Sequence, residues 1–211
     1  PSVDVIPSEH FNTVLYTGNA TDRTINGVGF PPSFVWLKGR SGSGSHGLFD
    51  TVRGAAKRLA SNSSNAEDTA AGVNSFESDG FVLDSANWND SNVTYVAWNW
   101  KLGGSAVSNS NGSATSQVSA NVDAGISIAT FTLPTTAQTI GHGLSKPPEL
   151  IFHKGRVSGS AWWTFHKDIG NTKAIRLDSS GAAGASTNFW NNTDPTSTVV
   201  TIGANSGGNN S

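Results

Sequence analysis

The sequence predicts an all-β protein built from two tandem antiparallel β-sandwich units with a jelly-roll-like plan. Its apolar segments are short and alternate with polar residues, which is typical of strands that are buried on one face. Glycine, asparagine, aspartate and proline interrupt these segments, and these residues favour turns. The second half of the chain repeats the pattern of the first half, which indicates two copies of one folding unit.

The repeat is clearest in residues 32–40, whose apolar centre and Lys-Gly-Arg ending return in residues 148–156. A Gly-x-Gly turn precedes each copy, at residues 27–29 and 141–143. The basic ending has two interpretations. Its charges can close a strand in contact with water, which is the usual place for lysine and arginine, or they can bind an acidic sugar or a partner's carboxylate.

The two copies, residues 32–40 and 148–156, are 116 positions apart. The same offset matches Phe49 with Phe165. Residues 51–60 contain good helix formers when they are considered alone. Their counterpart at residues 173–177 alternates in polarity and contains a β-branched isoleucine, which favours a strand. We therefore expect a turn followed by a strand in both units.

The repeat divides the chain into four segments. We expect a lead-in segment at residues 1–10, unit 1 at 11–102, a linker rich in glycine, serine and asparagine at 103–122, and unit 2 at 123–211. One thin polar strand is expected within the linker, around residues 115–118. Within unit 2, strands are expected at residues 150–153, 161–166, 173–177, 187–190 and 198–202.

Residues 94–100 form a tryptophan-rich strand that closes unit 1, and unit 2 has no counterpart in this chain. We expect either that the sequence is truncated after Ser211 or that another chain or segment fills the gap. An unfilled position would leave an apolar sheet edge exposed, which proteins avoid.

The composition excludes several classes of function. Only 13% of residues are charged and the formal net charge is -2, so we expect no nucleic-acid surface. No apolar run approaches the roughly 18 residues of a membrane helix, so we expect no membrane insertion. Cysteine and methionine are both absent, which excludes disulfides and thiolate metal sites.

The polar residues predict no enzyme, no cofactor and no metal. The acidic residues mostly stand beside glycine, asparagine or serine, as turn formers do. The histidines lack metal-ligand spacing, and no Gly-x-Ser-x-Gly motif precedes triad partners. A paired-carboxylate glycosidase remains an alternative, because one sequence does not place two carboxylates across a cleft.

Tryptophan is the most informative residue type, with seven copies. We expect Trp36 in the core because the repeat matches it with Phe152. Trp98 and Trp100 share one strand face, which is either a core face or a stacking platform if that face is open. The adjacent Trp162 and Trp163 point to opposite faces, so one of them is expected to face outward or into an interface.

Two tryptophans stand among amides and carboxylates in predicted loops. An exposed aromatic ring surrounded by such groups can stack on a pyranose while they bond its hydroxyls. The alternative is that each ring caps one end of a sandwich. The predicted glycan-contact residues are Trp88, Asn89, Asp90, Trp190, Asn191, Asn192 and Trp163.

Five segments carry a family resemblance: residues 13–19, 27–40, 50–54, 78–81 and 95–104. Together they resemble a repeat domain in virion proteins of tailed phages, notably phages of cyanobacteria and marine bacteria. The resemblance implies a tail-fibre, tail-tip or other surface component of the virion. It also implies an oligomer, usually a trimer, with other virion proteins as partners. It carries no catalytic residues to this chain.

These observations lead to three functional hypotheses. The first is a non-enzymatic tail fibre or adhesin that recognises host-surface glycans. The second is a capsid decoration or tail connector protein that binds only other virion proteins. The third is a polysaccharide depolymerase.

Overall fold

The protein folds as an all-β chain of antiparallel sheets, as the sequence predicts. The structure is a computed structural model that describes residues 5–69, 72–132, 135–186 and 188–204. The chain divides into two compact units. Unit 1 comprises residues 1–60 and 68–105, and unit 2 comprises residues 61–67 and 106–211.

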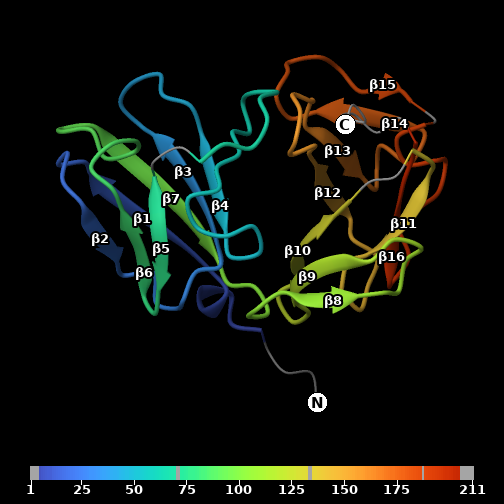
Figure 1. Ribbon diagram of the computed structural model, residues 1–211, viewed down its shortest axis with the longest axis horizontal. Coiled ribbons are helices and arrows are strands. Elements are labelled where there is room, and N and C mark those ends of the chain that lie inside the picture. Colours follow the sequence, from blue (N-terminus) through green and yellow to red (C-terminus); the bar gives the residue numbers. More distant parts are fainter. Residues whose placement is uncertain (1–4, 70–71, 133–134, 187, 205–211) are drawn as a thin grey trace. The chain divides into compact units, whose positions relative to one another are not determined.

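Unit 1 is a sandwich of two antiparallel sheets (Figure 1). In sheet order, the first sheet contains β1 (Phe11–Thr17), β7 (Thr94–Trp100), β3 (Phe34–Gly39) and β4 (Gly47–Asp50). The second contains β2 (Arg23–Asn26), β6 (Gly80–Leu83) and β5 (Val73–Glu77). A short 3₁₀ helix, η1 (Pro7–Glu9), precedes β1.

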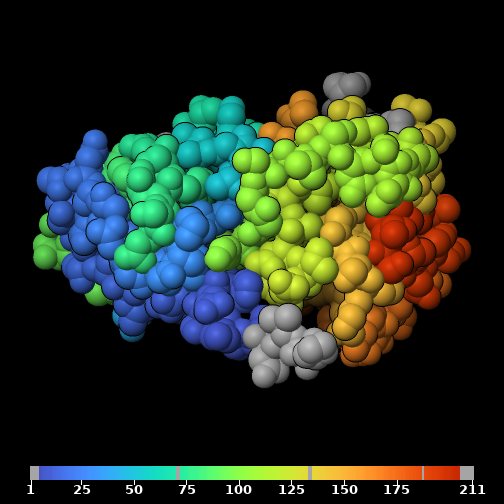
Figure 2. All heavy atoms as spheres, turned by 90° about the horizontal axis from the view of Figure 1, so that it is seen from below, coloured from blue at the N-terminus to red at the C-terminus, as the bar shows by residue number. Residues whose placement is uncertain are grey.

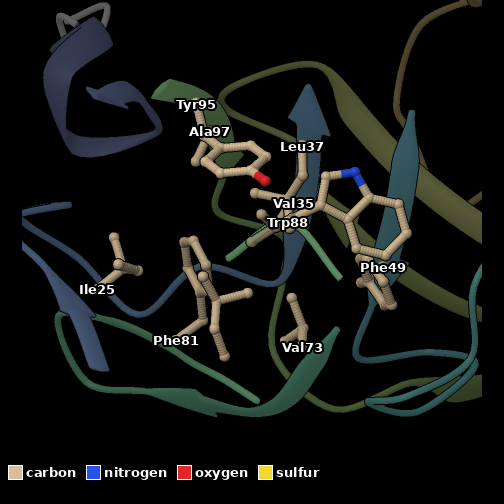
Figure 3. Packing of buried hydrophobic residues seen from close by; sticks show 10 residues of the cluster. Ile25, Val35, Leu37, Phe49, Val73, Phe81, Trp88, Tyr95 and Ala97 are labelled. Atoms are coloured by element: carbon tan, nitrogen blue, oxygen red, sulfur yellow. The ribbon is translucent and has the colours of Figure 1, made fainter. Parts of the chain in front are cut away.

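The core of unit 1 lies between these sheets because alternate side chains of each strand point inward. In β3, for example, Val35 and Leu37 are fully buried while their neighbours are half-exposed. Figure 3 shows the inward side chains of both sheets meeting. The buried cluster consists of Ile25, Val35, Leu37, Phe49, Val73, Phe81, Leu83, Trp88, Tyr95 and Ala97.

The described residues of unit 2 form three antiparallel sheets (Figure 1). The first is β10 (Ile126–Phe131), β9 (Ser116–Asn121) and β8 (Val107–Asn109). The second is β12 (Leu150–His153), β13 (Trp163–His166), β14 (Lys173–Arg176) and β15 (Gly184–Ala185). The third is β11 (Gln138–Gly141) with β16 (Val199–Ile202). Its buried cluster is Ile140, Phe165, Ala174, Phe189, Trp190, Val200 and Ile202.

Strand pairing reproduces the sequence repeat residue by residue. Val35 lies opposite Phe49 in unit 1, and Ile151 lies opposite Phe165 in unit 2, at the predicted offset of 116 positions. The next pair along the sheet has the same offset of 116 positions. The bridge between residues 48 and 59 corresponds to the pair between residues 164 and 175. The strand predicted after the turn is therefore confirmed in unit 2, where it is β14. In unit 1 the equivalent residues form only isolated bridges, at residues 58 and 59.

The predicted linker is wrong as a description of residues 106–121. Within them, β8 (Val107–Asn109) pairs with β9 (Ser116–Asn121), and β9 also pairs with β10. Figure 2 shows this light-green segment on the surface of unit 2. The composition misled because serine and asparagine can occupy an exposed strand whenever a neighbouring strand satisfies its backbone.

Two other boundaries differ from the prediction. Residues 61–67, which were assigned to unit 1, belong to unit 2, where the Ser64 carbonyl accepts a 2.8 Å hydrogen bond from the Ser160 amide. The strand expected at residues 187–190 is a turn at 188–190, and Thr187 lies outside the described residues.

A tryptophan occupies the same place in both cores but comes from different segments. Trp88, which follows β6, meets Phe49 edge-on at 5.5 Å between ring centroids. Trp190, which precedes β16, meets the equivalent Phe165 edge-on at 5.6 Å. Gly47 makes room in unit 1, because a Cβ atom there would lie 2.6 Å from Cζ2 of Trp88. Both units thus pack an indole ring against the equivalent phenylalanine, but a different segment of the chain supplies the indole in each unit.

We predict that Trp88→Ala and Trp190→Ala each lower the free energy of unfolding by about 3–5 kcal/mol, because each removes a buried indole from a packed core. Chemical denaturation followed by circular dichroism measures the change. Leu15→Ala and Val157→Ala serve as controls, since these side chains are 57% and 89% exposed. Tryptophan variants as stable as these controls would contradict the assignment of both rings to the cores.

Candidate functional site

The outer face of the first sheet of unit 1 is rich in aromatic residues. Since Val35, Leu37 and Ala97 point into the core, their strand neighbours point away from it. The side chains on this outer face include five aromatic rings, here called the aromatic face: Phe11, Phe34, Trp36, Trp98 and Trp100.

Strand register places three of these rings in one row. Trp100 lies opposite Phe11 on β1 and opposite Phe34 on β3. The ring centroids are 5.0 Å apart for Phe11 and Trp100, and 4.9 Å apart for Phe34 and Trp100. Such cross-strand aromatic pairs stabilise a sheet and hold each other in one orientation.

A second row joins Trp98, Trp36 and His46. Trp98 lies opposite Trp36, with ring centroids 6.1 Å apart in an edge-on arrangement. The Trp36 indole Nε1–H donates a 2.8 Å hydrogen bond to Nδ1 of His46. Burial and the nearby Lys38 ammonium lower the pKa of His46 below its ordinary value. The imidazole is therefore held neutral, which is the form that can accept this bond.

The aromatic face is better suited to a protein partner than to a sugar. Trp100 already contacts Phe11 and Phe34, so it does not present a free ring face for a pyranose. Phe11 and the neighbouring Leu15 are 39% and 57% exposed. Aromatic and aliphatic side chains that are partly exposed in one patch are typical of protein interfaces.

A second candidate site lies in unit 2 around Trp163. The Trp163 ring is half-buried, with Phe189 at 3.8 Å and the Arg176 guanidinium carbon at 6.0 Å from its centroid. Arg176 also donates two hydrogen bonds to Asp178, at 3.2 and 3.1 Å. These charges raise the pKa of Arg176 and lower that of Asp178, although burial of Asp178 opposes the latter shift.

The Trp163 ring lines a depression of about 330 Å³. Its other walls are Arg176 and small residues, among which Ser179 and Ser186 carry hydroxyl groups. A ring, a cation and hydroxyls around a shallow space can contact a small polar ligand. We call this group the Trp163 depression.

The chain belongs to the DUF7483 family. Residues 6–211 match this family, which is described as a domain of unknown function. No curated protein matches the chain, and no solved structure matches it.

Two of the three tryptophans predicted to hold glycans are buried. Trp88 and Trp190 are 6% and 2% exposed, so neither ring face can receive a sugar. Trp88 also donates from Nε1 to the Ser45 carbonyl at 3.0 Å. The capping alternative describes them better, because both rings pack into cores.

Asn89, next to Trp88, fastens a loop. Its side chain is fully buried, and it donates to the carbonyls of Thr21 at 2.7 Å and Asp84 at 2.9 Å. Asp90 is exposed and accepts a 2.8 Å hydrogen bond from the Tyr95 hydroxyl. These two residues therefore hold the loop that presents Trp88 to the core.

Asn191 and Asn192 are exposed, but they follow a buried ring. Both adopt the left-handed backbone conformation, with φ of 50°, which asparagine tolerates better than most residues. Their sequence signal is therefore a turn signal. Among the predicted glycan residues, Trp163 lines a depression.

The repeated basic endings have separate local partners. Lys38 donates to the Gly44 carbonyl at 3.0 Å. Lys154 donates to the Gly155 carbonyl at 2.7 Å, and burial lowers its pKa. Arg156 makes two hydrogen bonds to Glu67, at 2.9 and 2.7 Å. These contacts favour the interpretation in which the basic residues close the strands.

Among the described residues, no group of three or more histidines and carboxylates is arranged to hold a metal ion. In the same part of the chain, no helix has the length and apolarity that crossing a bilayer requires. The buried carboxylate Asp50 accepts hydrogen bonds from Arg53, which also donates to the Leu48 carbonyl. Asp50 thus serves to hold the turn after β4.

The aromatic face was only half anticipated. The alternation predicts that Trp98 and Trp100 share a face, and the structure leaves this face partly open. Trp36, which was expected in the core, lies on the same face and is half-buried. The overlooked signal is that its neighbours Val35 and Leu37 are also apolar, so both faces of β3 carry apolar side chains.

We predict that the pKa of His46 lies below its ordinary value of 6.5 and rises in Trp36→Phe, which removes the Nε1 donor and some burial. The stability that the neutral ring contributes is complete above pH 6.5 and is lost as the pH falls toward the lower folded value. Proton NMR titration measures the pKa, and His46→Gln should remove this part of the pH dependence. A His46 midpoint at or above 6.5 in the parent protein would refute the prediction.

Proposed function

We propose that this chain is a non-enzymatic module of a phage virion surface that acts through protein contacts on the aromatic face of unit 1. The observation that carries this proposal is a row of partly exposed aromatic side chains across three strands of a rigid sheet. Interfaces are enriched in such side chains, and a sheet holds them without a large loss of entropy on binding.

The virion assignment rests on the sequence resemblance to repeat domains of tailed-phage proteins. Residues 95–104 belong to that resemblance, and they include the strand that contributes Trp98 and Trp100 to the aromatic face. Structural virion proteins assemble through repeated copies and neighbouring proteins. The partner class proposed here is therefore another virion protein, including further copies of this chain in a trimer.

We predict that this chain self-associates and that Leu15→Glu weakens association at least about tenfold, because it places a charge on an apolar contact surface. Light scattering over a range of protein concentrations measures the oligomer. Val157→Glu is the matched control, because this side chain is 89% exposed and lies outside the aromatic face. Equal effects of the two variants, or a monomer at every concentration, would count against self-association through this face.

The Trp163 depression supports a second candidate function, recognition of a host-surface glycan. It combines a partly exposed tryptophan with hydroxyl groups and an arginine that is 44% exposed. Arginine together with an aromatic ring favours an acidic sugar, since the guanidinium bonds carboxylates well. This candidate retains the adhesin hypothesis at a different site from Trp88 and Trp190.

We predict that Arg176→Gln reduces binding to acidic glycans at least about fivefold, because it removes the guanidinium charge. We also expect it to lower the free energy of unfolding by about 1–3 kcal/mol, because the Asp178 side chain is 2% exposed and loses its two hydrogen bonds from Arg176. A glycan array followed by NMR titration of bound sugars measures the change in binding. Phe152→Ala is the control for an exposed aromatic residue elsewhere in unit 2.

The same measurements bear on the alternatives. Binding that survives Arg176→Gln would exclude the depression as the glycan site. Release of reducing sugar from a host polysaccharide would overturn the non-enzymatic assignment and favour a depolymerase. Antibody labelling of the intact particle would test the virion placement directly.

A further inference from the structure

The turn between β12 and β13 of unit 2 holds an acidic segment of the same unit, residues 61–67. The Ser160 amide donates to the Ser64 carbonyl at 2.8 Å. The Glu67 amide donates to the Arg156 carbonyl, also at 2.8 Å. The Arg156 guanidinium binds the Glu67 carboxylate through two further hydrogen bonds, at 2.9 and 2.7 Å. The turn thus recognises both the backbone and the acidic side chain of the segment.

The Glu67 carboxylate is largely withdrawn from water in this contact. Its side chain is 11% exposed, and that of Arg156 is 39% exposed. A bidentate pair of arginine and carboxylate that is shielded in this way is stronger than a pair in open solvent. The backbone bonds fix the direction of the segment, and the ion pair fixes its register. Backbone bonds combined with one specific side-chain contact are a common way to recognise an extended peptide.

The turn between β3 and β4 of unit 1 is the repeat of this turn. The ladder pair next to the turn is Leu37 with Gly47 in unit 1 and His153 with Trp163 in unit 2. Both members of the pair differ by the offset of 116 positions, so the two turns have the same length. Every residue of one turn therefore has a counterpart in the other.

A lysine holds both turns in a similar way. Lys38 donates to the Gly44 carbonyl at 3.0 Å. Its counterpart Lys154 donates to the Ser160 hydroxyl at 3.4 Å, and Ser160 is the counterpart of Gly44. The two turns thus share their length, their basic residues and the internal contact of the lysine.

The groups that bind the segment in unit 2 have counterparts in unit 1 that make no contact with protein. Arg40, the counterpart of Arg156, is exposed, and among the described residues its guanidinium has no hydrogen bond and no ion pair. Within the same part of the chain, the Arg40 carbonyl and the Gly44 amide are also without a partner. The Arg40 amide donates to the Thr94 carbonyl at 2.7 Å, so β7 holds the backbone that carries these groups.

An extended polypeptide with a carboxylate fits this arrangement. In unit 2, the carbonyl that the turn binds belongs to Ser64, and the carboxylate belongs to Glu67, three residues later. The unit 1 turn offers the same amide donor, carbonyl acceptor and guanidinium. An acidic sugar could pair with the guanidinium, but it does not carry a peptide carbonyl and a peptide amide at this spacing. The bound segment of unit 2 therefore favours a peptide as the ligand.

We propose that the turn between β3 and β4 is a peptide-binding site for an extended acidic segment of a partner protein. The Gly44 amide donates to a carbonyl of this segment, and Arg40 binds a glutamate three residues later, as Arg156 binds Glu67. The proposal does not depend on the proposed function, because it rests on a comparison of two turns and not on the aromatic face.

The test uses a peptide with the sequence of residues 61–67, capped at both ends, and titrates it into the complete chain. NMR follows the Arg40 side-chain Nε–H and the Gly44 amide. We expect both resonances to shift and saturate in the millimolar range, because one ion pair and two backbone bonds form a small interface. The same peptide with Glu67→Gln should bind at least about tenfold more weakly, because it loses the charged pair.

Two variants of the chain separate the site from general charge attraction. Arg40→Gln should abolish the shift of the Gly44 amide, and it should fold normally because the side chain it replaces is exposed. Circular dichroism verifies the fold. Lys146→Gln removes an equal charge from an exposed position in unit 2 and should leave binding unchanged.

Four results would overturn the proposal. They are no saturable shift at Arg40 and Gly44, equal binding by the two variants, shifts confined to Arg156 and Ser160, and an equal response to sodium glucuronate. The third would show that the peptide only exchanges with the segment already bound in unit 2. The fourth would show that the turn binds a carboxylate without recognising a peptide.

Discussion

The pairing of β7 with both β1 and β3 is the interaction on which unit 1 depends. This one strand satisfies the backbone groups of two neighbours that are far apart in sequence. It also contributes to both sides of the sheet, with Tyr95 and Ala97 in the core and Trp98 and Trp100 on the aromatic face. The buried Asn99 strengthens the junction by donating to the Asn12 carbonyl at 3.1 Å. The core, the sheet and the proposed contact surface therefore share one element.

Comparison of the two units separates what the fold requires from what it permits. The β3–β4 ladder of unit 1 and the β12–β13 ladder of unit 2 have the same register. Both also place an indole edge-on to the phenylalanine in this ladder. The indole comes from after β6 in one unit and from before β16 in the other. A core cavity constrains the shape and polarity of the group that fills it, and it does not constrain the route of the chain that delivers it.

The same comparison explains why aromatic residues have different roles here. Trp88 and Trp190 fill cores and are closed to ligands. Phe34, Trp36, Trp98 and Trp100 cover the outer face of a sheet, where they contact one another and remain partly exposed. A tryptophan in a polar loop segment is thus a weak indicator of a sugar site, because the polar neighbours can serve the loop itself, as Asn89 does.

The sequence by itself determined the all-β class and the repeat with its offset of 116 positions, because alternation, turn residues and repeated segments are local properties. It assigned residues 103–122 to a linker with one thin strand and did not determine that β8 and β9 pair in a sheet with β10, since polar strands depend on a neighbour to satisfy their backbone. It placed Trp36 in the core, where the structure does not have it, and it left open whether Trp88 and Trp190 are buried. Only the tertiary structure decided this, because burial depends on which distant segment packs against each ring, and a strand with apolar residues on both faces does not identify its inner one.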